Sequence, residues 1–123
     1  MSASYHYDTV AFDVRENTTM LFFARTNLRG DIEDYLLLMR TVEETREEFI
    51  FLEVNEEQLD GSRLIRAAEM SENILSLFFF EPIKVFDGAT RLVLTFENSE
   101  ENRTAMEVGA FRVLGDKLTG GHA

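Results

Sequence analysis

The sequence contains no cysteine, which excludes a disulfide framework and a thiolate metal site and is typical of a reducing cytosol. Its only histidines, His6 and His122, have no ligand-type neighbours at metal spacing, so we interpret both as surface residues. No apolar run approaches the roughly 18 residues of a membrane span. Residues 1–8 lack the basic and apolar regions of a signal peptide. Together these absences predict a cytoplasmic protein.

Basic residues are also scarce, with 12 Lys and Arg against 23 Asp and Glu and a net charge of −11. Nucleic-acid binders and proteins held on anionic membranes need a basic footprint, so we expect neither partner. Residues 41–60 alone carry eight acids and one base, which gives −7. This segment is either a solvated loop pair or a landing site for a basic partner. The candidate contact residues are Glu43, Glu44, Glu47, Glu48, Glu53, Glu56, Glu57 and Asp60.

Motifs for catalysis are missing as well. The chain has no Gly-x-Ser-x-Gly elbow and no glycine-rich phosphate loop before a helix. Residues 53–58, read as extended chain, place acids on both sides but lack the spacing of a calcium loop. We therefore expect a protein that is not an enzyme, with no catalytic residues, no cofactor and no bound metal.

Hydrophobic residues make up 45% of the chain, enough for one folded domain, which we place at residues 1–116 with a disordered tail at 117–123. Alternation of apolar and polar residues and turn signals predict mostly β-structure. Asp87-Gly88 favours a type I′ hairpin between two strands. Tyr5 and Tyr7, which flank His6 on an alternating segment, either dock as an edge strand or stay loose. The expected strands cover 10–14, 18–25, 35–39, 49–54, 64–70, 74–80, 83–86 and 89–96.

One helix is expected at about 99–114, with Asn98 as N-cap and Gly115 at its C-terminal end. Helical spacing predicts one apolar stripe with a small centre that would let the helix approach a sheet closely. The stripe consists of Met106, Gly109, Ala110, Val113 and Leu114, and Phe111 lies off it.

These patterns predict an α+β fold, a mainly antiparallel β-meander of about seven or eight strands with one C-terminal helix. A single helix covers only one face of a sheet, yet several strands are apolar on both faces. In the 49–54 strand, for example, Phe49 and Phe51 oppose Ile50 and Leu52. We therefore expect a sheet that curls or forms two layers, or a second copy of the chain that covers the remaining face.

The middle of the chain combines Tyr-Leu-Leu-Leu-x-Arg at residues 35–40, an acidic loop, and Glu-x-Asn-x-x-Gln at residues 53–58. Gly61 and two apolar strands that end at residues 75–80 follow. This order resembles the tenth immunity-protein family of bacterial polymorphic toxin systems, over about residues 18–115. The residues that add detail are Tyr35, Arg40, Glu53, Asn55 and Gln58.

The resemblance implies a cytoplasmic antidote that binds a cognate toxin domain and blocks it without catalysis. An acidic blocker suits a toxin whose own substrate is nucleic acid, because such a toxin presents a basic surface. Two alternatives stay open. One is a self-associating structural or accessory protein that buries the Phe49/Phe51 face or Phe111 in a homodimer. The other is a small ligand-binding domain with a cavity in a curled sheet, where Glu53 would be the polar group.

Overall fold

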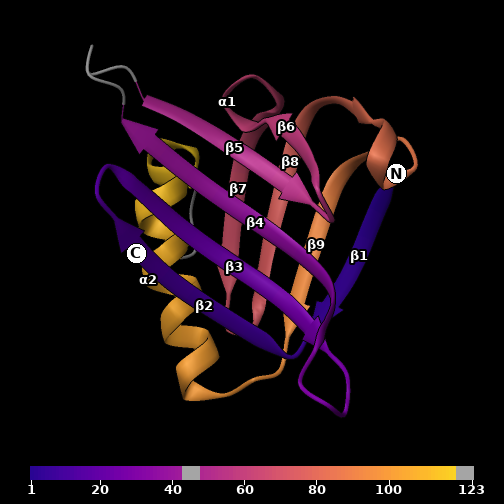
Figure 1. Cartoon of the computed structure of the whole chain (residues 1–123). Helices are drawn as coiled ribbons and strands as arrows, with labels where there is room; N and C mark the ends of the chain where they lie inside the picture. The colour runs from indigo at the N-terminus through magenta and orange to yellow at the C-terminus, as the bar shows by residue number, and fades with distance from the viewer. Residues whose placement is uncertain (43–47, 119–123) are drawn as a thin grey trace.

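A computed structural model describes residues 1–42 and 48–118. These residues form two layers, and the strands of the front and rear sheets cross each other in Figure 1. The front layer is an antiparallel five-stranded meander, in which each strand pairs with the next along the chain. Its strands are β2 (Thr9–Arg15), β3 (Thr18–Thr26), β4 (Ile32–Val42), β5 (Glu48–Val54) and β6 (Glu57–Asp60).

The rear layer combines a four-stranded sheet with the C-terminal helix α2 (Glu100–Leu114). Its strand order is β1-β9-β8-β7, and β1 runs parallel to β9 while the other pairs are antiparallel. The strands are β1 (Ser2–Tyr7), β7 (Ile65–Ser71), β8 (Ile74–Ile83) and β9 (Ala89–Phe96). The short helix α1 (Gly61–Leu64) joins the two sheets, and η1 (Lys84–Phe86) and η2 (Gly115–Lys117) are single 3-10 turns.

The expected α+β class, the two-layer arrangement and the C-terminal helix are confirmed. The count of seven or eight strands was too low, because the described residues form nine, and the sheets do not curl. Residues 2–7 are an edge strand that pairs with β9, which lies near the other end of the chain. No local pattern marks such a parallel pairing, which makes the rear sheet mixed.

The hairpin expected around Asp87-Gly88 is wrong in its first strand, because residues 83–86 do not form a separate strand. Residues 84–86 form the 3-10 turn η1, and β8 continues through Pro82 to Ile83. Asp87 and Gly88 do adopt the positive φ that an Asp-Gly turn predicts, at 55° and 82°. The dipeptide therefore ends a helical turn before β9, a role that requires the same left-handed backbone.

Helix α2 begins one residue later than expected, with Ser99 rather than Asn98 as its N-cap, and the Ser99 hydroxyl accepts from the Asn102 backbone N–H. All five residues of the expected apolar stripe are buried. A Cβ on Gly109 would lie 2.6 Å from Leu21 Cδ1 of β3, so only glycine permits this approach. No helix among the described residues is long and apolar enough to span a membrane.

The first two residues of the expected tail, Lys117 and Leu118, contact the rear sheet. The Lys117 ammonium donates to the Ile65 carbonyl, and Leu118 bridges to Ala68 and is buried. Residues 119–123 lie outside the described residues, as do 43–47.

One buried amide side chain joins α2 to both sheets. Asn102 is 8% exposed, and its amide nitrogen donates to the carbonyls of Asp8 and Glu97 at 3.1 and 3.0 Å. Its oxygen accepts from the Val10 N–H of β2 at 3.1 Å. Asp8 lies between β1 and β2 and Glu97 follows β9, so one side chain fixes the helix start at the point where the layers meet.

Replacement of this amide should cost stability without changing the topology. Asn102→Ala leaves three backbone groups without their side-chain partner, and we expect a loss of about 2–3 kcal/mol in the free energy of unfolding. Chemical denaturation measures this, with Thr104→Ala on the exposed side of α2 as the control, expected to change stability by less than about 0.5 kcal/mol. Equal stability of the two variants would contradict the proposed role of Asn102.

Candidate functional site

The outer face of the front sheet follows directly from its register. Leu21, Leu38 and Leu52 lie opposite one another, and all are fully buried against the rear layer. Side chains alternate along a strand, so their neighbours point to the other side. One row of neighbours runs Asp13, Met20, Met39, Phe51 and Asp60, and the next runs Ala11, Phe22, Leu37, Glu53 and Gln58.

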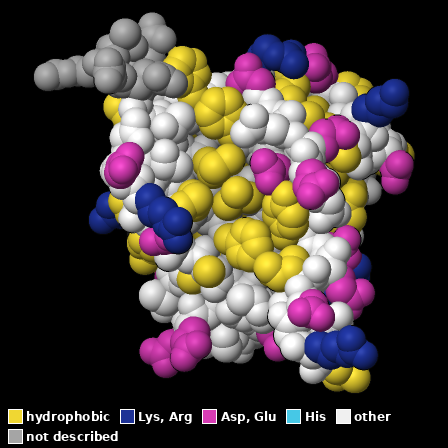
Figure 2. Space-filling view, in the orientation of Figure 1, with side chains coloured by type: hydrophobic (Ala, Val, Ile, Leu, Met, Phe, Trp, Pro, Cys, Tyr) yellow, Lys and Arg dark blue, Asp and Glu magenta, His cyan; other side chains and the backbone are white. Residues whose placement is uncertain are grey.

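These rows form an apolar surface with acidic residues at its margin. Its core consists of Met20, Phe22, Leu37, Met39, Phe49 and Phe51, which we call the outer patch. All six side chains are partly exposed, and no element among the described residues packs over them. Figure 2 shows the patch as hydrophobic side chains across the middle of this face, with Asp and Glu beside it. A contiguous apolar area of this kind on a sheet usually marks an interaction site.

The patch is bare because the helix lies on the opposite side. Helix α2 packs against β2, β3 and β4 on the face that also meets the rear sheet. In the sequence, Phe49 and Phe51 alternate with Ile50 and Leu52. This pattern indicated that both faces of the strand are apolar and that the second face also needs a cover. Sequence reasoning missed Met20, Phe22, Leu37 and Met39 as candidate contacts. The sequence predicted the strands that carry these residues, but it did not predict the strand pairing that places them side by side.

A hydrogen-bonded corner borders the patch. The Tyr35 hydroxyl donates to the Glu53 carboxylate at 2.5 Å and accepts from the Glu56 backbone N–H at 2.9 Å. The bond to Glu53 is the main reason that the pKa of Tyr35 is raised. Phe22 stacks on the Tyr35 ring, with the ring centroids 5.7 Å apart. The Glu53 charge is thus held at a fixed position beside the apolar rows.

Asn55 completes this corner through a tight turn. Asn55 and Glu56 both have positive φ, at 45° and 77°, and Asn55 Oδ1 accepts from the Tyr35 N–H at 2.9 Å. The extended reading of residues 53–58 is therefore wrong, because the turn places Gln58 opposite Glu53. Asn adopts the left-handed backbone conformation readily, which explains why the chain can turn at Asn55 between β5 and β6.

Arg40 supports the fold rather than the outer patch. It pairs across the sheet with buried Ile50, and its Nε donates to the Val113 carbonyl at the end of α2 at 2.8 Å. Its guanidinium also pairs with Glu48 at 2.9 Å. Of the five residues that detail the family resemblance, Arg40 caps the helix, and Tyr35, Glu53 and Asn55 build the corner.

The five acidic candidates that the structure describes do not form one surface. Glu43, Glu44 and Glu47 lie outside the described residues. Glu53 and Asp60 share the outer face with Phe51, and Asp60 also accepts from the Arg63 N–H as the N-cap of α1. Glu56 lies in the turn between β5 and β6. Glu48 and Glu57 pair with Val42 and Val54 on the other side of the sheet, and Glu57 lines a cleft there.

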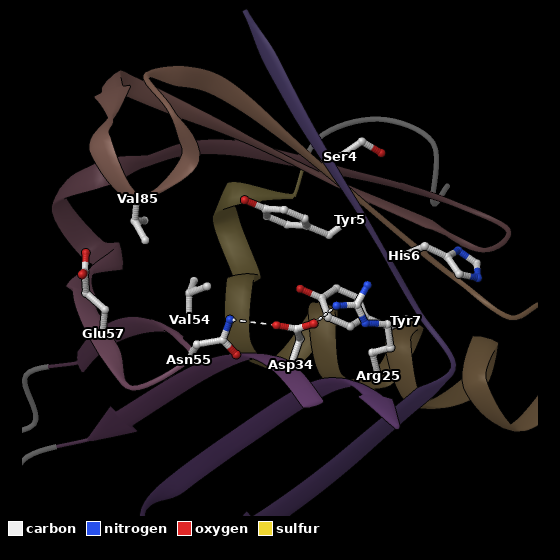
Figure 3. Close-up of a pocket in the computed structure, with 10 residues that line it drawn as sticks. All are labelled: Ser4, Tyr5, His6, Tyr7, Arg25, Asp34, Val54, Asn55, Glu57 and Val85. Atoms are coloured by element: carbon white, nitrogen blue, oxygen red, sulfur yellow. Dashed lines mark hydrogen bonds and ion pairs between the residues drawn. The ribbon is translucent and has the colours of Figure 1, made fainter. Parts of the chain in front are cut away.

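That cleft has a volume of about 490 Å³ and lies where β1 meets the ends of the front strands. Figure 3 shows Tyr5 and Tyr7 of β1 on one side and Asp34, Val54 and Asn55 on the other. Asn55 Nδ2 donates to Asp34, which also pairs with Arg25. Glu53 does not line this cleft, and the described strands show no curl of the kind that the alternative of a Glu53 cavity assumed. No cluster that could hold a metal is found among residues 1–42 and 48–118.

The two faces of β5 should respond differently to mutation. Leu52→Ala opens a cavity in the core, and we expect it to cost about 3 kcal/mol or more. Phe51→Ala removes a partly exposed ring, and we expect a cost of about 1 kcal/mol in the isolated protein. Urea denaturation of both variants tests the assignment, and an equal or larger loss for Phe51→Ala would show that the outer patch is buried.

Searches of protein families, of curated proteins and of solved structures return no match for this chain. Function is therefore inferred from the geometry of the outer patch and from the motif at residues 35–58.

Proposed function

We propose that this protein is an immunity-type antidote, which binds a basic bacterial toxin domain and blocks it without catalysis. The observation that carries the proposal is the outer patch, an uncovered apolar sheet face with Glu53 and Asp60 in its rows. The motif that resembles the tenth immunity-protein family lies on the same strands, and it suits a site of action in the bacterial cytoplasm.

The chemistry of this face suits a protein partner better than a small molecule. A broad apolar centre with a charged rim is the usual anatomy of a protein interface. Phe22, Phe49 and Phe51 offer aromatic anchors of the kind that dominate binding energy. The fixed carboxylate of Glu53 needs no side-chain ordering on binding because Tyr35 already holds it.

Charge selects among protein partners. A chain with a net charge of −11 attracts a basic surface at long range and speeds encounter with it. The same charge opposes a second copy of the chain, since a dimer formed through this face would bring two acidic molecules together. A toxin domain that cuts or modifies nucleic acid carries the required basic surface.

Neutralisation in cells tests this function. The proposal predicts a toxin domain encoded beside this gene, and coexpression of that domain with the wild-type protein should restore growth. Met39→Lys and Phe51→Lys place a cation in the outer patch and should abolish rescue. Phe80→Lys is the matched control, because Phe80 is 65% exposed on β8 of the rear sheet, and it should rescue fully.

A second experiment tests the acidic segment at residues 41–60. Simultaneous reversal of Glu43, Glu44, Glu47 and Glu48 to Lys should slow association with the toxin and flatten its salt dependence, as measured by surface plasmon resonance. Unchanged rescue and unchanged kinetics would exclude this segment as a contact. Full rescue by both patch variants would contradict the proposed binding face.

A further inference from the structure

β1 has one edge that no other described strand pairs with, and this edge opens onto the cleft. Within residues 1–42 and 48–118 it pairs only with β9, at the edge of the rear sheet (Figure 1). The Met1 and Tyr7 carbonyls accept from Thr90 and Glu97 on the β9 side, at 3.0 and 3.1 Å. Backbone groups alternate in direction along a strand, so residues 1, 3, 5 and 7 point toward β9. Ser2, Ser4 and His6 consequently direct their N–H and C=O groups toward the open edge.

The cleft beside this edge can hold an extended chain. It is lined by the consecutive residues 4–7 of β1 and, across the opening, by Val54, Asn55, Glu57 and Val85. Six residues of strand span about 20 Å, so four to six residues of a peptide fit along β1. In Figure 3, Tyr5 and Tyr7 point into the space between the layers while Ser4 and His6 point away. A strand added here would also place alternate side chains in the cleft.

The lining favours positive side chains in such a strand. Asp34 is already paired with Arg25, but Glu57 is exposed and has no ion pair among the described residues. Asp87 lies close enough to influence the Tyr5 hydroxyl electrostatically. Among the residues that line the cleft, the carboxylates of Asp34 and Glu57 outnumber the single guanidinium of Arg25, so the lining carries net negative charge.

We propose that the β1 edge and its cleft form a peptide-binding site that adds an extended, lysine- or arginine-containing segment of another protein as a fifth strand of the rear sheet. Backbone hydrogen bonds to Ser4 and His6 would supply affinity, and the acidic lining would select basic side chains. This site is separate from the outer patch and does not depend on the proposed function.

The probe is the acetylated and amidated hexapeptide Thr-Lys-Val-Lys-Val-Thr, measured with the full chain by NMR titration. We expect saturable shifts at the backbone amides of Ser4 and His6 and slower amide exchange there. The peptide Thr-Glu-Val-Glu-Val-Thr should bind at least tenfold more weakly. Methylation of the backbone nitrogens that face β1 should also weaken binding at least tenfold, because it removes strand pairing but keeps the charges.

Variants of Ser4 separate edge pairing from simple charge attraction. Ser4→Pro removes an N–H that faces the open edge and leaves the β9 ladder intact, so it should fold and bind at least tenfold more weakly. Ser4→Ala keeps the N–H and should bind like wild type. If Ser4→Pro fails to fold, the N-methylated peptide still decides the question on the unaltered protein.

Three results of the peptide titrations would overturn the proposal. These are equal binding of the methylated and unmethylated peptides, equal binding of the acidic and basic peptides, and amide shifts confined to the outer patch. A chain that already pairs β1 with β1 of a second copy would also overturn it, since that edge would then be occupied.

Discussion

Burial of the inner face of the front sheet is the interaction on which the rest of the structure depends. Leu21, Phe23, Leu36, Leu38 and Leu52 are fully buried there, against a rear layer made of a sheet and one helix. That layer is assembled from distant parts of the chain, with β1 inserted beside β9 and α2 held at its start by Asn102 and at its end by Arg40. Because both elements pack on the inner face, no element in the described part of the chain covers the outer one.

The functional proposals follow from the exposure of the outer face of the front sheet. An apolar outer face on a strongly acidic protein has a defined complement, which is an apolar surface bordered by bases. The polar corner of Tyr35, Glu53 and Asn55 fixes part of the acidic margin, so the face is organised before a partner arrives. The open β1 edge has a similar origin, because β1 is the last strand of the rear sheet and nothing in the described chain pairs with its free side.

Local patterns were enough to predict the elements but not their partners. Alternation revealed most strands, and the apolar stripe of α2 with its small centre predicted the close approach of Gly109 to Leu21. The parallel pairing of β1 with β9 depends on residues about ninety positions apart, and no turn signal encodes it. The site was foreseen in part: the two-faced pattern around Phe51 predicted a second apolar face that needs a cover, whereas the residues of the outer patch could be gathered only from the β3–β4–β5 register. The turn at Asn55 places Glu53 and Glu57 on opposite faces of the sheet. An extended segment would place them on the same side, so the sequence pattern did not predict this.

Sedimentation equilibrium of the isolated protein, at low and at high salt, tests whether the outer patch is uncovered in the free protein. We expect a monomer near the sequence mass of 14.2 kDa at micromolar concentrations and low salt, where repulsion between acidic chains is strongest. A stable dimer under these conditions that dissociates in Phe51→Lys but persists in Phe80→Lys would contradict this expectation, because the patch would then be covered by a second copy.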